Sequence, residues 1–321
     1  MKRAMLAASV CVALSGAVAL PGVVQAFRPA AQADLKVRTT TVTATTTGTA
    51  TGTTTVTKDQ VNRWMTDLSN WGRRDKTDQI GTLNLITADK RRQALTLVRD
   101  GISVSLAHTI DKEKAADNPR PLGQEVTLDA GGHAMDLYFI WYHGSIITHI
   151  DSLCHYSFEG KIFNGFERSA IAPGPGCPSN GIDNHKNGIM TRGVIVDLPR
   201  MRNVAYLEPG TPVYPSDLDA LFLRTGRWAR RAEKGPWNVA ANAACFHASV
   251  MPWLEQRDVA LLGNDAVNDV QPSGVEGSPR PIHQLAIVAL GLPLVDVMDL
   301  EAAAVPVLGG TGFPLNPIAT F

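Results

Sequence analysis

Apolar and polar positions follow short periods along the chain, and these periods predict both helices and strands. Thr87 is a candidate N-cap for a helix over residues 88–98, where apolar side chains recur at helical spacing, and Gly101 ends that helix. Residues 102–106 alternate between apolar and polar side chains, as a half-buried strand does. This stretch is therefore predicted to be a helix followed by a strand.

The same reasoning predicts strands over residues 135–141, 193–198 and 259–262, and helices over residues 216–224 and 281–290. Helices and strands are mixed without a strict strand–helix–strand rhythm and without a long internal repeat. The pattern favours a single mixed α/β domain over a Rossmann fold or a barrel.

The first residues have the layout of a secretory signal peptide. Lys2 and Arg3 form a short positive region, residues 5–20 are mostly apolar, and small residues precede a cleavage point near Ala26. An uncleaved N-terminal anchor is the alternative. Because no other apolar run approaches membrane length, we expect an exported protein, periplasmic or secreted, with no membrane span after cleavage of residues 1–26.

A threonine-rich stretch at residues 38–57 lacks the bulky apolar side chains that offset the entropy of ordering. We interpret residues 27–58 as a disordered or glycosylatable spacer, with a β-rich edge as the alternative. The folded domain is then predicted to cover residues 59–321.

The composition and net charge of the chain indicate which kind of molecule it binds. The chain is 44% hydrophobic and 19% charged, with zero formal net charge, which is typical of a soluble globular protein and gives no sign of nucleic-acid binding. A small-molecule substrate is therefore favoured. Cleavage of the signal peptide would remove Cys11 and leave Cys154, Cys177 and Cys245, so at most one disulfide can form within the chain.

The densest chemistry lies in the stretch YHGSIITHIDSLCHYSFEG, which begins at Tyr142. In an extended segment, side chains two residues apart project the same way, so His149 and Asp151 can converge on one ion. His155 follows four residues later, close enough to carry protons beside that ion. Imidazole and carboxylate suit Zn²⁺ or Mn²⁺, but a buried polar cluster without a metal remains open from spacing alone.

The segment THIDSLCH resembles the THxDxxxH core of the metal-dependent cyclase superfamily, which includes bacterial kynurenine formamidases and isatin hydrolases. Further motifs that resemble this superfamily follow in the same order: DQIGTLNLIT, GVIVDL, RTGRW, DVALLGNDAVND and PIHQLAIVALGLPLVDVMDLE. The resemblance begins near Asp67 and extends into the C-terminal region. It implies a swivelling β/β/α fold and a homodimer or larger homo-oligomer.

The resemblance also implies site residues. His149 and Asp151 take the places of metal ligands, and His155 takes the place of the general acid/base. The family pattern HxGTHxDxxxH has a further ligand four residues before His149, where this chain has Ser145; His143, two residues earlier, either replaces that ligand or leaves the site with fewer.

His283 resembles a further family ligand that opens a helix. Asp296 approximates an acidic ligand that is usually Glu at a slightly different spacing, and its other interpretation is a hydrogen-bonding residue at a strand end. One or two divalent ions per chain, Zn²⁺ or Mn²⁺, are implied.

The implied reaction is hydrolysis of a C–N bond, in an aryl formamide or a cyclic amide, by metal-activated water with His155 as acid/base. Lactone hydrolysis, dehydration or cyclisation at the same site is an alternative, and so is an exported binding protein whose site has decayed. A Cys154 nucleophile with His155 and Asp151 is a weaker rival, because adjacent side chains diverge. Aromatic residues could wall the substrate pocket or pack in the core: Trp71, Trp141, Tyr142, Phe158 and Phe163.

Overall fold

The computed structural model describes residues 55–98, 101, 103–174, 176–217, 222–304 and 318–320. The predicted signal peptide and nearly all of the predicted spacer lie outside these residues. Within the described residues, no helix combines the length and the hydropathy that crossing a membrane requires.

Short elements connected by long turns make up the described part of the chain. The helices are α1 (Lys58–Asp67), α2 (Ala88–Leu95), α3 (Leu198–Met201), α4 (Arg227–Lys234), α5 (Met251–Gln256), α6 (Pro281–His283), which continues as the π-helical segment η7 (Gln284–Leu290), and α7 (Glu301–Ala304). The 3-10 turns are η1 (Gly81–Leu85), η2 (Phe163–Gly165), η3 (Arg168–Ala170), η4 (Ile182–His185), η5 (Pro215–Asp217) and η6 (Ala248–Val250). The strands are β1 (Gly123–Leu128), β2 (Ala134–Phe139), β3 (His149–Asp151), β4 (Met190–Arg192), β5 (Ile195–Asp197), β6 (Pro212–Val213), β7 (Phe222–Arg224), β8 (Cys245–Phe246), β9 (Leu262–Asn264), β10 (Leu294–Asp296) and β11 (Ile318–Thr320).

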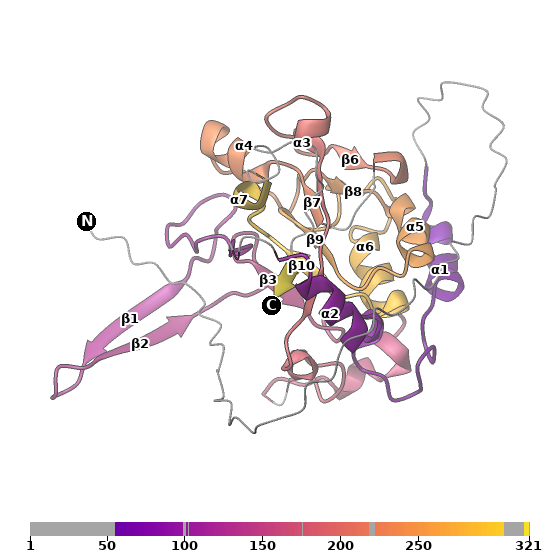
Figure 1. Ribbon diagram of the computed structural model, residues 1–321, viewed down its shortest axis with the longest axis horizontal. Helices are drawn as coiled ribbons and strands as arrows, with labels where there is room; N and C mark the ends of the chain where they lie inside the picture. The colour runs from indigo at the N-terminus through magenta and orange to yellow at the C-terminus, as the bar shows by residue number, and fades with distance from the viewer. Residues whose placement is uncertain are drawn as a thin grey trace, which may run out of the picture. The chain divides into compact units, whose positions relative to one another are not determined.

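The central sheet has five strands in the order β3-β10-β9-β7-β5 (Figure 1). The four strands β10, β9, β7 and β5 run parallel, and β3 joins β10 antiparallel. The register places Asp296 of β10 opposite His149 of β3, so the carboxyl end of β10 meets the start of β3. In open sheets of this kind ligands bind beyond the carboxyl ends of the parallel strands.

Both faces of the sheet are covered, because successive side chains of a strand point to opposite faces. Leu223, Leu262 and Leu294 belong to a large core that α1, α5 and η7 complete on one side (Figure 1). Their strand neighbours Phe222 and Val295 belong to a second core on the other face. A strand buried on both faces is continuously apolar, which explains the short apolar runs in the sequence.

The described residues of the domain include several before the predicted boundary at residue 59. Val56 is buried in the main core, and the Thr57 side chain accepts a hydrogen bond from the Gln60 N–H as the N-cap of α1. These two residues belonged to the predicted spacer. A threonine is favourable in a spacer and at an N-cap alike, so composition alone does not separate the two.

Other predicted elements are confirmed in type, with shifted ends. Thr87 caps α2 as predicted, with its side chain accepting a hydrogen bond from the Lys90 N–H. The strand predicted over residues 135–141 is β2, and the helix predicted over residues 281–290 is α6 with η7. The mixed α/β class predicted from the pattern is also the observed one.

Two predicted elements are wrong. Residues 103–106 alternate in exposure but pair with no strand in the described part of the chain; the one bridge there joins Ala107 to Met298. The helix predicted over residues 216–224 is not helical where the structure describes it: its start belongs to the turn η5 and its end is the central strand β7, while residues 218–221 lie outside the described residues. Periodicity does not distinguish a short buried strand from a buried helical turn, and the apolar run ending at β7 is such a case.

The hairpin of β1 and β2 extends away from the central sheet (Figure 1). Its apolar side chains are exposed on both faces, among them Leu128 at 72% and Met135 at 59%. It leads directly into residues 140–143, so the hairpin and the first histidine of the predicted site share one segment.

Gly291 ends η7 in the left-handed region at φ +64°, and its carbonyl accepts a hydrogen bond from the Thr82 N–H at 2.8 Å. A Cβ here would overlap the Phe163 ring. We therefore expect Gly291→Ala to lower the free energy of unfolding in urea by about 3 kcal/mol, from overpacking and backbone strain together. Gly101→Ala is the matched control, since Gly101 has the same φ of +64° with nothing within 4 Å of its Cβ position. Equal losses for both variants would contradict the packing argument.

Candidate metal centre

Asp151 is the centre of the site. Its side chain is 1% exposed at the end of β3, and neither of its oxygens has a hydrogen-bond partner among the residues that the structure describes. Oδ1 lies 3.0 Å from His143 Nδ1, 3.6 Å from His149 Nε2 and 3.9 Å from His155 Nε2. Oδ2 lies 3.5 Å from His283 Nε2. Four imidazoles thus surround one buried carboxylate.

His149 is oriented by the backbone of its own strand. Its Nδ1–H donates to the Ile147 carbonyl at 2.7 Å, which fixes the tautomer and leaves Nε2 free to face Asp151. Its Cα partner across the ladder is Asp296. The two-residue alternation of β3 therefore brings His149 and Asp151 to one face, as the sequence predicted.

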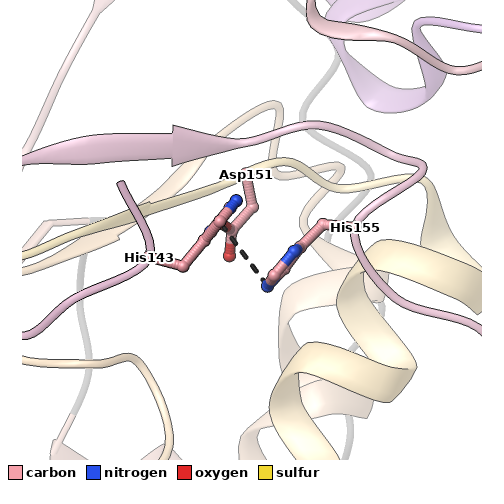
Figure 2. A group of neighbouring side chains, drawn as sticks. All are labelled: His143, Asp151 and His155. Carbon is pink, nitrogen blue, oxygen red and sulfur yellow. Dashed lines mark ion pairs between the residues drawn. The ribbon is translucent and has the colours of Figure 1, made fainter. Parts of the chain in front are cut away.

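His143 and His155 lie on the more open side of Asp151 (Figure 2). Their rings stack at 3.9 Å between centroids with an interplanar angle of 5°. The side chains are 47% and 28% exposed, respectively, so solvent or substrate can reach both. This is the side on which a reacting molecule would approach.

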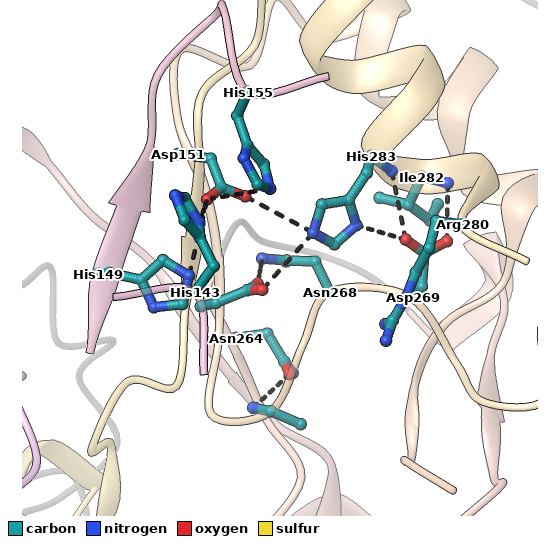
Figure 3. Close-up of polar contacts among 12 residues, drawn as sticks. His143, His149, Asp151, His155, Asn264, Asn268, Asp269, Arg280, Ile282 and His283 are labelled. Carbon is teal, nitrogen blue, oxygen red and sulfur yellow. Dashed lines mark hydrogen bonds and ion pairs between the residues drawn. The ribbon is translucent and has the colours of Figure 1, made fainter. Parts of the chain in front are cut away.

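His283 faces Asp151 from α6 on the opposite side (Figure 3). Its Nδ1 lies 2.5 Å from Asp269 Oδ2, and its Nε2 lies 3.5 Å from both Asp151 and Asp296. Asp269 also accepts a hydrogen bond from the Ile282 N–H at 2.7 Å, so the carboxylate holds both the helix start and the ring. Asn268 donates to Asp296 Oδ1 at 2.6 Å.

The protonation equilibria reflect this crowding. Burial opposes ionisation of Asp151, but the close contact with His143 and the charges of the other imidazoles outweigh it and lower the pKa of Asp151. Burial lowers the pKa of His155 despite the Asp151 carboxylate. Burial also opposes protonation of His283, yet the contacts with Asp269 and Asp296 raise its pKa to about 10. Metal binding by His283 would displace that proton, because an imidazole ligand is neutral.

The residues fit a divalent cation. Two groups have ligand atoms that all lie within 4.8 Å of one another: His149 with Asp151 and Asp296, and His143 with Asp151 and His155. A buried carboxylate without hydrogen-bond partners is costly unless a cation balances it. Imidazole nitrogen and carboxylate oxygen are the ligands that Zn²⁺ and Mn²⁺ accept.

All six residues predicted from the sequence come together here: His143, His149, Asp151, His155, His283 and Asp296. Ser145, in the place of a family histidine, is held through its carbonyl by the Arg227 guanidinium. The longer loop from His143 to His149 carries His143 back to Asp151. The His143 Nδ1 atom is thus close enough to Asp151 Oδ1 for both atoms to contact one ion.

The sequence reasoning missed the supporting residues Asn268 and Asp269. Both are at most 1% exposed and belong to the stretch DVALLGNDAVND, in which polar residues follow an apolar strand. The position of these polar side chains directly after a buried strand could have indicated a site, because such residues lie at the carboxyl edge of the sheet, where ligands bind.

The predicted aromatic wall is only partly at the site. Phe163 is fully buried in the main core, Phe158 packs against it, and Trp71 donates its ring N–H to the Val288 carbonyl. Trp141 and Tyr142 are exposed beside His143. An aromatic that was not singled out lies closer: the ring of Tyr156 is 5.7 Å from that of His283.

The Cys154 nucleophile is contradicted by the structure, in which Cys154 forms a disulfide with Cys177. A disulfide sulfur is not the thiolate that nucleophilic catalysis requires. Within the described ranges Cys245 is the free cysteine, and it is buried.

Asp269→Asn tests the support of His283. Removing a carboxylate that orients an imidazole ligand weakens metal binding about 10- to 100-fold, and we expect that loss here. Competition with a chromophoric chelator measures it. Asp129→Asn is the control, because Asp129 pairs with His133 in the same way on the exposed hairpin. Unchanged metal affinity in Asp269→Asn would remove His283 from the ligand set.

Comparison with known proteins agrees with this architecture. Residues 104–268 match the sequence model of the cyclase family, described as "Putative cyclase". A crystal structure of a novel cyclase superposes with a TM-score of 0.66 and 24% identity, covering 79% of this chain and 98% of that chain. At this identity the likeness shows a shared fold.

Two isatin hydrolase structures are more distant. Isatin hydrolase A from Labrenzia aggregata, bound to benzyl benzoate, has a TM-score of 0.46 and 15% identity, covering 70% of this chain and 89% of that chain. An isatin hydrolase bound to the product analogue thioisatinate has a TM-score of 0.42 and 13% identity, covering 68% of this chain and 91% of that chain. The sequence matches no curated protein.

Proposed function

Because the chain belongs to the cyclase family, we propose that it is a metal-dependent hydrolase that cleaves the C–N bond of an aryl formamide or a cyclic amide. The observation that carries this proposal is Asp151, which is buried, has no hydrogen-bond partner in the described part of the chain and is surrounded by four histidines. Such an arrangement suits a cation and leaves ionisable groups beside it for proton transfer.

The ligand set we propose combines His149, Asp151 and Asp296 from adjacent strands with His283 from α6 and His143 from the preceding loop. A divalent ion held by these side chains would supply Lewis-acid activation of water and of the carbonyl group. The short strands fix three of the five residues on backbone that the central sheet holds.

His155 is the proposed acid/base. Burial keeps its pKa low, so the ring is neutral near pH 7 and can accept a proton at Nε2 from the attacking water. The same nitrogen then returns the proton to the departing amine nitrogen, which is a poor leaving group without it. Its stacking on His143 keeps the imidazole edge directed at Asp151 (Figure 2).

We also propose that the protein works outside the cytoplasm. The disulfide between Cys154 and Cys177 supports the export expected from the N-terminal sequence, because such bonds persist in oxidising compartments. Fractionation of cells that produce the full chain would test this: recovery of the protein only in the cytoplasm contradicts export.

Metal removal tests the function. We expect elemental analysis to find Zn²⁺ or Mn²⁺ in the purified protein, and dialysis against a chelator to abolish hydrolysis of an aryl formamide. Restoring the ion should restore the rate. A parallel panel of cyclic amides and lactones separates C–N from C–O cleavage. Full activity of metal-free protein, or activity on lactones alone, would contradict the proposal.

A further inference from the structure

The Cys154–Cys177 disulfide lies directly beside the proposed acid/base. Cys154 immediately precedes His155 in the turn after β3 and is 8% exposed, whereas Cys177 is half-buried in a separate segment 23 residues later. A covalent bond therefore links the backbone next to the His155 imidazole to a second part of the chain.

The His155 ring has few other restraints. Among the described residues no hydrogen bond reaches its imidazole. The ring stacks on His143, its centroid lies 6.0 Å from that of Tyr156 and 6.5 Å from that of His283, and its Nε2 lies 3.9 Å from Asp151 Oδ1. The His155 N–H donates to the Ser152 carbonyl at 3.0 Å, which closes the turn. Leu153 anchors this turn from the core side, and the disulfide adds a covalent restraint at Cys154.

The far end of the disulfide is firmly attached to the domain. Asn180, three residues after Cys177, is 1% exposed. Its backbone N–H donates to Gln79 Oε1 at 2.8 Å, and its side chain donates to the Phe163 carbonyl at 2.8 Å. Phe163 packs in the main core. The disulfide to Cys177 therefore connects the His155 turn to that core a second time, in addition to the packing of Leu153.

We propose that the Cys154–Cys177 disulfide is a positioning cross-link for His155, so that its reduction lowers turnover without releasing metal. This inference rests on the proposed function of His155. Reduction by a phosphine breaks the S–S bond with two electrons, gives two thiols, and converts the phosphine to its oxide with oxygen from water. Displacing an acid/base by about 1 Å can cost about 100-fold in rate, while ligands on β3 and β10 stay in place.

The experiment compares oxidised and phosphine-reduced protein for kcat, KM and metal content. We expect kcat to fall about 10- to 100-fold with KM changed less than about twofold and metal content unchanged. Cys177→Ser should show the low kcat without reductant and respond no further to it. Cys245→Ala is the control for loss of a cysteine and should respond to reductant as the parent does.

Three results would overturn the inference: an unchanged kcat on reduction, an effect on KM alone, or loss of metal together with activity. Cobalt-substituted protein adds a spectroscopic check, since a thiolate-to-cobalt band after reduction would mean that the freed Cys154 binds the ion. Backbone hydrogen exchange of residues 152–158 in metal-free protein should accelerate on reduction. If the oxidised protein hydrolyses no amide, the proposed function fails, and the exchange measurement still decides whether the disulfide restrains the turn.

Discussion

Asp151→Asn is expected to remove metal and activity together. The substitution keeps the shape of the side chain but removes the charge that faces four imidazoles within 3.9 Å. A neutral amide presents an N–H₂ group to at least one of those ring nitrogens and no longer balances a divalent charge. We expect metal content close to zero after gel filtration and a loss of kcat/KM of about a thousandfold or more, because removing the ion removes its share of transition-state stabilisation.

A stability measurement separates this from simple misfolding. Metal at about 100 times its Kd should stabilise the parent by about 2.7 kcal/mol, and Asp151→Asn should gain almost nothing from the same addition. Asp258→Asn is the control, since Asp258 pairs with Arg73 on the surface and such pairs contribute about 0–1 kcal/mol. A variant that keeps bound metal would mean that Asp151 is a hydrogen-bonding residue and not a ligand.

The sequence predicted the fold class and several elements, because caps and long periodic segments carry local information. Thr87 can be identified as an N-cap because its own hydroxyl provides the capping hydrogen bond. Residues 281–290 form an apolar run that is too long for a typical strand. The strand β7 was mistaken for a helix because its neighbours β5 and β9 are distant in sequence. Pairing between such strands is a tertiary property that no local window contains.

The six residues singled out from the sequence lie close together in the structure. Four of its six residues lie within 13 positions of one another, and the alternation of β3 orients two of them. The fit of His143 could not be derived, because it depends on how the loop before β3 folds back and on Arg227 holding Ser145. Asp269 was missed for a similar reason. Its supporting role depends on the contact with His283, and that contact results from tertiary packing and not from the spacing of the two residues in the sequence.

His155→Ala is expected to separate proton transfer from metal binding. Of the four imidazole nitrogens that face Asp151, His155 Nε2 is the farthest, at 3.9 Å, and its side chain is more exposed than those of His149 and His283. Loss of a general acid/base costs about 10²- to 10⁴-fold in kcat, and we expect a fall in that range with metal content unchanged. His133→Ala, on the exposed hairpin, is the control and should leave both quantities unchanged.

The pH profile gives the same test a second readout. A base acts only when it is deprotonated, so the rate of the parent should fall as the pH drops through the pKa of His155. Burial lowers that pKa, which places the fall on the acid side of the ordinary histidine range. In His155→Ala this acid limb should disappear and the small remaining rate should no longer titrate there. A fall in metal content together with the rate would mean that His155 is a ligand. Persistence of the acid limb would mean that another group carries the proton. The first candidate would then be His143, whose side chain is the most exposed of the four histidines.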